Sequence, residues 1–324
     1  MRDDHGPGYL PVVATAAVLG VVPLLVGDSR YAMTLAISML VVAAHAVAFN
    51  LIFGSTGQLF LCLGALAGIA AYTTVLLSDR VGVPVTVSLV VGVACSATVG
   101  GLLSWVAVRR RLGVIFVGIV TLAFSLVFTN LLLGGREVTG GETGLLVEAG
   151  AGTFLRSRVA AYYLLLGILV VYLGLHRRLE RSPLGWAFRA LKDDPAAAEL
   201  AGVDVARAKV AAAAIGSAML GLTGALFALH DGFVSPTGFD VADVDIRVLV
   251  VLGIGGIGSL LGPIVGAVVV TAVDDLLRPL GQLRLTVYGI VLIVIFLRFP
   301  DGIARRLTAD LRRGVDLLRR RRTG

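Results

Sequence analysis

The chain has 324 residues, of which 57% are hydrophobic and only 15% are charged; its mean hydropathy is +0.93. Soluble domains carry about 25% charged residues, and a compact soluble fold cannot bury so much apolar surface. The composition therefore excludes soluble, fibrous, disordered, disulfide-framed and nucleic-acid-binding proteins. It predicts an all-α polytopic membrane protein.

Apolar runs follow one another along the chain, most of them near the 20 residues that a bilayer crossing requires. We expect the first run to be retained as a span, because its flank has no basic bias and no cleavage site follows it. The runs predict about nine or ten transmembrane or re-entrant helices in a membrane domain of residues 1–303. They lie at 10–26, 31–53, 59–77, 83–108, 112–133, 160–176, 208–230, 246–273 and 285–299.

Basic residues predict the orientation of the chain. The arginines at 109–111 mark a cytoplasmic loop, which places the N-terminus inside, 134–159 outside as an external loop, and 177–207 inside as an insert. Much of the net charge of +7 comes from an Arg-rich tail, 304–324, that is expected to meet membrane lipid in the cytoplasm. We therefore expect a multi-pass protein of a bacterial-type inner membrane with both termini cytoplasmic.

The Gly-rich run 246–273 conflicts with a count in which every apolar run crosses the membrane once. Two such crossings after residue 245 would leave the Arg-rich tail outside the cell, although its charge predicts a cytoplasmic position. The centre of the Gly-rich run, GIGGIGS at 253–259, is an improbable helix, since each glycine costs about 1 kcal/mol relative to alanine. We expect an interrupted or re-entrant pair of segments surrounded by protein. Gly258, Gly262 and Gly266 recur every four residues and predict close helix packing.

A polar patch, GSTGQ at 54–58, separates two apolar runs. It indicates either a tight cytoplasmic turn or a broken helix. In the second case, freed backbone groups, together with Thr56, Gly57 and the Gln58 amide, line a path for a solute.

Hydroxyls follow one face of the 112–133 run. Thr121, Ser125 and Thr129 are four residues apart, so they either bond back to carbonyls one turn earlier or face a polar solute. His45 and Asn50 leave the same choice between an interhelical hydrogen bond and a ligand contact. The candidate translocation path thus comprises Asn50, Thr56, Gly57, Gln58, Thr121, Ser125 and Thr129.

The expected outer loop contains TGGETG at 139–144. Thr139, Gly140 and Gly141 form either a flexible turn or an external docking or gating loop. On the same side, an acidic cluster precedes Arg247. A charge at the bilayer centre costs about 2.5–3.5 kcal/mol, so Arg247 is expected to pair near the interface with one member of that cluster: Asp240, Asp243 or Asp245.

The cytoplasmic insert contains two short helices with start and stop signals. Ser-Pro at 182–183 opens a helix over 184–192, and Asp-Pro at 194–195 opens another over 196–201. Gly202 then supplies a left-handed stop. Two capped helices predict a rigid projection that fits a groove on a cytoplasmic partner.

Motifs for chemistry are absent from the sequence. Neither lysine follows a glycine as a Walker loop requires, and neither H-E-x-x-H nor G-x-S-x-G occurs. We therefore expect no catalytic residue, no metal site and no cofactor bound by this chain.

In order, these patches resemble the LivM-type permease subunits of branched-chain amino acid ABC importers. The likeness extends from about residue 31 to 303. It rests on NLIFGSTGQ (50–58), IVTLAF (119–124), TGG (139–141), RSPLG (181–185), AAE (197–199) with GVD (202–204), GGIGS (255–259) and FPDGI (299–303).

The resemblance implies the ABC importer permease architecture and a heteromeric machine. Its parts are a second, LivH-like permease subunit, two cytoplasmic ATPase subunits that hold ATP and Mg, and an extracytoplasmic solute-binding protein. The resemblance also implies that 193–202 is the coupling segment that meets the ATPase. The ATPase-coupling residues are then Arg189, Asp193, Asp194, Ala198, Glu199 and Gly202.

The expected function is inward translocation of branched-chain or related small amino acids by alternating access, without enzymatic activity in this chain. Related permeases carry urea or short amides, which leaves that alternative open. An ion-coupled secondary transporter would need carboxylates inside the membrane, and only Asp274 and Asp275 are candidates. A membrane-embedded enzyme would need catalytic groups, and the sequence shows no such grouping. A purely structural scaffold would not explain either of the two predicted helix breaks.

Overall fold

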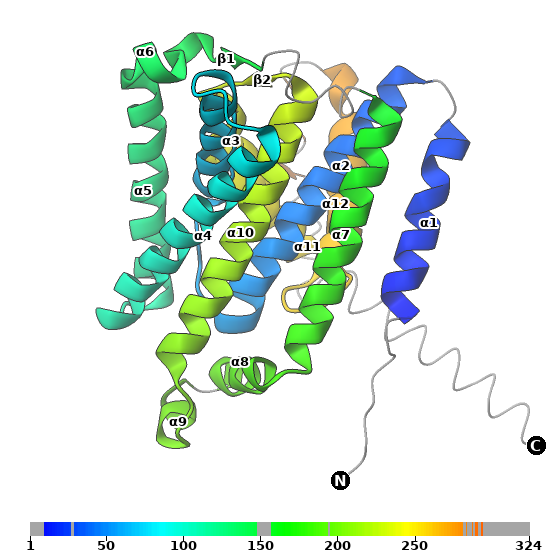
Figure 1. Cartoon of the computed structure of the whole chain (residues 1–324). Helices are drawn as coiled ribbons and strands as arrows, with labels where there is room; N and C mark the ends of the chain where they lie inside the picture. The colour runs from blue at the N-terminus through cyan, green and yellow to red at the C-terminus, as the bar shows by residue number, and fades with distance from the viewer. Residues whose placement is uncertain are drawn as a thin grey trace, which may run out of the picture.

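The computed structural model describes residues 10–26, 29–147, 157–193 and 195–280, with five single positions between 283 and 293. The described part is a bundle of helices lying side by side (Figure 1). Apart from one short two-stranded ladder, all regular structure in these ranges is helical. The predicted tail, 304–324, lies outside the described residues.

Helix boundaries follow most of the predicted apolar runs closely, whereas the run predicted at 285–299 lies almost wholly outside the described residues. Five helices within the described ranges have the length and hydropathy to cross a bilayer: α2 with η1, α4, α5, α7 and α10. Two shorter apolar helices, α1 and α3, accompany them. This supports a multi-pass membrane protein without deciding the predicted count of nine or ten. The elements are α1 (Leu10–Val26), α2 (Arg30–Phe49), η1 (Asn50–Gly54), α3 (Leu63–Asp79), α4 (Val85–Arg109), α5 (Val114–Gly134), α6 (Arg136–Thr139), η2 (Gly141–Thr143), β1 (Leu145–Leu146), α7 (Arg158–Glu180), α8 (Pro183–Asp193), α9 (Pro195–Leu200), α10 (Val205–Asp231), β2 (Phe233–Val234), η3 (Pro236–Phe239), η4 (Val241–Ile246), α11 (Arg247–Gly255), α12 (Gly262–Leu276) and η5 (Arg278–Leu280).

The centre of the bundle is α2, whose second half is buried almost without interruption. It packs against α7, α12 and α10, while α10 packs on its other side against α3 and α4. By contrast, α4 and α5 have only about a fifth of their apolar windows buried (22% each). Their outer faces are therefore available to lipid or to another membrane subunit.

The Gly-rich run is interrupted, as predicted. Helix α11 ends at Gly255, residues 256–261 are non-helical, and α12 begins at Gly262. A Cβ added at Gly255 would lie 1.9 Å from the Gly262 carbonyl oxygen, and one at Gly266 would lie 2.0 Å from that of Val251. Gly255 at the end of α11 thus lies beside Gly262 at the start of α12, and Val251, one turn earlier, lies beside Gly266, one turn later. Helices α11 and α12 therefore form an antiparallel hairpin.

We expect Gly266→Ala to destabilise this hairpin, because the new methyl group would overlap backbone atoms that cannot rotate away. The apparent melting temperature of the purified chain should fall by several degrees. Gly101→Ala is the matched control, since its Cβ would meet only the Ala214 side chain at 3.5 Å. Equal melting temperatures for the two variants would contradict the packing described.

Two sets of small elements occupy opposite ends of the bundle (Figure 1). At one end, β1 pairs antiparallel with β2, with Leu145 opposite Val234. At the other end lie α8 and α9, the two helices predicted for the cytoplasmic insert. The chain thus joins its two predicted external loops at one end and projects its insert from the other.

Candidate solute pathway and coupling surface

The predicted break after the second apolar run is present, and it is longer than expected. Helix α2 passes into the π-helical turn η1, and the backbone from Gly57 to Cys62 is non-helical before α3 begins at Leu63. Gly57 has a left-handed φ of +70°, which favours glycine there. The apolar run predicted as 59–77 is therefore a helix only from Leu63 onward.

Asn50 joins this break to the break in the α11–α12 hairpin. Its Nδ2 donates to the Ser259 carbonyl at 2.9 Å, and its Oδ1 accepts from the Gly258 N–H at 2.7 Å. Gly258 has a φ of +76°, a conformation that exposes its N–H to the amide. One buried carboxamide thus holds together two irregular segments that are about 200 positions apart in the sequence.

Replacing Asn50 with leucine is expected to release these segments from each other. Two backbone groups would lose their partners, and an unsatisfied buried polar group costs about 1–3 kcal/mol. Asn50→Asp is the informative comparison, because aspartate can still accept from Gly258 but cannot donate to Ser259. Thermal unfolding should rank the proteins wild type, Asn50→Asp, Asn50→Leu; indistinguishable curves would contradict the clamp.

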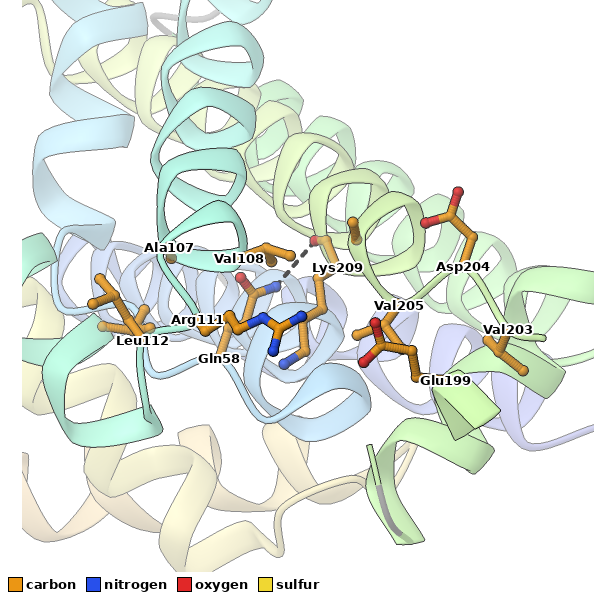
Figure 2. A pocket seen from close by; sticks show the side chains of 12 residues that line it. Gln58, Ala107, Val108, Arg111, Leu112, Glu199, Val203, Asp204, Val205 and Lys209 are labelled. Atoms are coloured by element: carbon orange, nitrogen blue, oxygen red, sulfur yellow. Dashed lines mark hydrogen bonds between the residues drawn. The ribbon is translucent and has the colours of Figure 1, made fainter. Parts of the chain in front are cut away.

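Gln58 ties the first break to two long helices. Its buried side chain donates to the Lys209 carbonyl at 3.0 Å (Figure 2). It also donates to Thr56 Oγ1 at 3.1 Å and accepts from Ser104 Oγ at 2.7 Å. Thr56 in turn bonds back to the Ile52 carbonyl. In this conformation these polar groups bond to protein, so they brace the break and leave few donors for a solute.

A cavity of about 380 Å³ lies beside Gln58, between the end of α4, the start of α10 and α9. Figure 2 shows the Arg111, Lys209 and Glu199 side chains around the same space. Arg111 adopts a left-handed φ of 51° where the chain leaves α4. The cavity connects the first break directly to the predicted cytoplasmic insert.

The hydroxyl face of α5 points into the bundle. Thr121 and Ser125 are buried and Thr129 is half-buried. Thr121 Oγ1 bonds back to the Val117 carbonyl at 2.9 Å and also accepts from the Leu61 N–H at 2.9 Å. The structure therefore has the back-bonded hydroxyl of the first reading, and it adds a contact with the non-helical segment that neither reading included.

Sequence reasoning missed the role of Asp245. This fully buried carboxylate accepts from the Leu63 N–H at 2.5 Å and from the Gly64 N–H at 3.3 Å, at the first turn of α3. A helix N-terminus favours a negative charge, and residue 62, the cap position, is a cysteine without a side-chain cap. The absence of a capping side chain at residue 62 was the sequence feature that could have indicated a distant partner for the first turn of α3.

The predicted partner of Arg247 was wrong. Its guanidinium pairs with Asp274 of α12, at an Nη2 to Oδ2 distance of 3.5 Å, rather than with Asp240, Asp243 or Asp245. The hairpin explains the difference, because it returns the end of α12 to the start of α11.

The insert has both predicted helices, and the N-cap predicted at Ser182 is present, whereas the cap predicted at Asp194 lies outside the described residues. Ser182 Oγ accepts from the Gly185 N–H at 3.4 Å at the start of α8, and Gly202 ends α9 with a φ of +82°. Arg189 lies over the Trp186 ring at 4.4 Å and donates to the Glu180 carbonyl. Of the other candidate coupling residues, Ala198 is buried and Glu199 is exposed; Asp194 and the Asp193 side chain lie outside the described residues.

The insert also contacts the hairpin break. A Cβ added at Gly258 would lie 2.5 Å from Lys192 Nζ and 3.3 Å from the Gly54 carbonyl oxygen. The end of α8 therefore lies against the point where the two breaks meet.

The candidate external residues form an ordered turn. Thr139 Oγ1 donates to the Leu132 and Gly135 carbonyls at 2.5 and 2.9 Å, and Gly140 and Gly141 have φ values of +74° and +55°. The turn leads directly into the β1–β2 pairing. This favours a fixed surface over a flexible loop.

Buried polar breaks inside an all-α bundle, with a capped insert at one end, define a multi-pass membrane protein of the transport-permease class. Within the described ranges no group of three or more metal-binding side chains occurs. The chain belongs to the branched-chain amino acid transport system / permease component family, whose model matches residues 31–297. This confirms the resemblance drawn from the motifs.

Curated relatives include permeases for two kinds of solute. The high-affinity branched-chain amino acid permease protein LivM of Salmonella typhimurium is 31% identical over 301 residues, covering 85% of this chain and 70% of that protein. LivM of Escherichia coli is also 31% identical, over 78% of this chain and 65% of the relative. The fructose import permease protein FrcC of Rhizobium meliloti is 24% identical over 89% and 84%. No solved structure matches the chain significantly.

Proposed function

We propose that this chain is a membrane-spanning subunit of an ATP-driven importer that moves branched-chain or related small amino acids inward by alternating access. The observation that carries the proposal is the capped insert α8–α9, whose Lys192 end lies against the junction of the two breaks. Movement imposed on the insert from the cytoplasm reaches irregular backbone inside the bundle through direct contact. Family membership and the two LivM relatives support the amino acid as cargo.

The insert is suited to receive a protein partner. Trp186 of α8 is 69% exposed and Leu200 at the end of α9 is 92% exposed. A protein partner that binds the insert would bury both side chains, and aromatic residues are enriched in such interfaces. In this proposal two ATPase subunits cover them and hold ATP and Mg, since this chain has no Walker motif of its own. Both termini then lie on the cytoplasmic side.

The remaining partners follow from the same architecture. A LivH-like permease subunit covers an outer face of the bundle, and a solute-binding protein docks at the end formed by Thr139, Gly140, Gly141 and the β1–β2 ladder. ATP-driven closure shifts the permease between two states only if the ATPase contacts them differently. In this proposal the candidate path residues, from Asn50 to Gln58 and along the hydroxyl face of α5, change partners between these states.

The proposal is tested by co-purifying the assembled importer from native membranes and reconstituting it in proteoliposomes with the binding protein. Labelled leucine should accumulate only with ATP, and an uncoupler should leave uptake unchanged. Urea, acetamide and ribose are supplied as competing cargo. Uptake that the uncoupler abolishes, or that any of these solutes outcompetes at equal concentration, would overturn the proposal.

A further inference from the structure

A second cavity, of about 170 Å³, lies between helices of the bundle, includes the exposed Asp243 in its lining, and belongs to neither break. Its walls come from α2, α10 and the segment from η3 to α11. On α2 the lining residues Ser38, Val41, Val42 and His45 share one helical face, because their spacing is three to four residues. The cavity therefore lies against the most buried helix of the protein.

One wall carries a polar group that lacks a partner. His45 is 6% exposed, and its Nε2 is buried without a hydrogen bond among the described residues. Buried polar atoms are rarely left unpaired, because the desolvation penalty is not offset. Because Nε2 is itself buried, a solute in the cavity would reach it only after the imidazole ring rotates.

The opposite wall carries both signs of charge. Arg247 and Asp243 lie four residues apart where η4 passes into α11, and both line the cavity. The Arg247 guanidinium has five N–H donors, so its contact with Asp274 leaves donors for a carboxylate. Asp243 has no hydrogen bond or ion pair in the described ranges, and its carboxylate is an acceptor for an ammonium group.

The remaining lining is apolar, with Val41, Val248 and Phe227 among its members. The volume corresponds to about six water molecules at about 30 Å³ each, which limits the occupant to a solute of few heavy atoms. An uncharged sugar or urea would bring no counter-charge to the exposed Asp243 carboxylate, so it would gain less from this wall than a solute with an ammonium group. A zwitterion with a small apolar side chain matches both charges and the apolar wall.

The cavity has a neighbour that leads toward one end of α2. A cavity of about 470 Å³ is lined by Arg30, Tyr31 and Thr34 at the start of α2, and Ser38 lines both cavities. Polar side chains thus continue along one face of α2 from its first turn to His45.

We propose that this chain holds its own binding site for a zwitterionic amino acid with a small aliphatic side chain, in which Arg247 binds the carboxylate and Asp243 binds the ammonium group. The inference rests on the proposed function for its choice of solute. It adds that the site lies within one subunit.

The test uses the purified full chain in lipid nanodiscs and saturation-transfer NMR, which detects weak binding. Four probes are compared: leucine, leucinamide without a carboxylate, 4-methylpentanoate without an ammonium group, and ribose. Leucine should bind about tenfold more tightly than either singly charged analogue, the factor expected from losing one charge-assisted hydrogen bond. Ribose should not compete.

Variants separate recognition from folding. In Arg247→Gln the preference for leucine over leucinamide should vanish, and in Asp243→Asn the preference over 4-methylpentanoate should vanish. Asp274→Asn is the matched control: it breaks the same ion pair but leaves Arg247 in the cavity, so both preferences should persist. A selectivity that is unchanged in Arg247→Gln and Asp243→Asn would overturn the site.

The two proposals fail separately. Leucine uptake by the assembled importer, without zwitterion-selective binding to this chain, would overturn the site and leave the proposed function standing. Absence of leucine uptake would overturn the proposed function, whereas selective binding that depends on Arg247 and Asp243 would still support the site.

Discussion

Glu199→Arg is expected to uncouple ATP hydrolysis from amino acid uptake in the assembled importer. Glu199 is exposed on α9 and lines the same cavity as the basic side chains of Arg111 and Lys209. A third positive charge there repels the other two, and it reverses the charge offered to the proposed ATPase partner. Hydrolysis should persist while uptake falls by about tenfold or more, measured as leucine transported per ATP hydrolysed.

Two companion variants sharpen this result. Glu199→Gln removes the charge without reversing it and should reduce coupling to a smaller degree. Asp231→Arg makes the same change of charge at the far end of α10, where arginine suits the helix dipole, and should leave the ratio unchanged. If Glu199→Arg transported as much leucine per ATP as the wild type, the ATPase would have to act on another part of the chain.

Features that local sequence dictates could be predicted. Proline, glycine and a capping side chain act within one turn, so the bounds of α8 and α9 followed from Ser182, the two prolines and Gly202. The hairpin break was predictable for a related reason, because several glycines cannot sustain a helix at the centre of an apolar run. Helical spacing alone placed the α5 hydroxyls on one face, but it did not determine which way that face points.

Features that depend on distant partners could not be predicted. The residues at 59–62 are apolar and continue into α3 without a local stop signal, so they were expected to be helical. Their conformation depends on Thr121, which binds the Leu61 N–H from another helix. Likewise, Asn50 was a candidate solute ligand because nothing in its neighbourhood shows that Gly258 and Ser259 fold back onto it.

The path residues illustrate why a site is harder to locate than a fold. Asn50, Gln58 and Thr121 all lie inside the bundle, yet their hydrogen bonds go to protein in this conformation. The polar type of these side chains within or between apolar runs indicated that they lie inside the membrane domain. Which groups they form hydrogen bonds with depends on how the two helix breaks pack together. The charged cavity at Arg247 escaped prediction for the same reason, since the ion pair with Asp274 exists only once the hairpin has closed.

Asp245→Leu is expected to be the most destabilising single substitution in the described bundle. The carboxylate is the partner of two N–H groups in the first turn of α3, and water is excluded from that site. Leucine preserves bulk but accepts no hydrogen bond, so both donors become unsatisfied, each at about 1–3 kcal/mol. The variant should give little monodisperse protein after solubilisation and a melting temperature lower by roughly 10 °C.

Asp243→Leu is the control for this prediction, because it alters an exposed carboxylate on the same π-helical turn that caps no helix. It should melt close to the wild type. Asp245→Asn retains one acceptor oxygen without the charge and should fall between the two. If Asp245→Leu matched Asp243→Leu, the start of α3 would have to be stabilised by other groups, and the link between α3 and η4 would lose its physical basis.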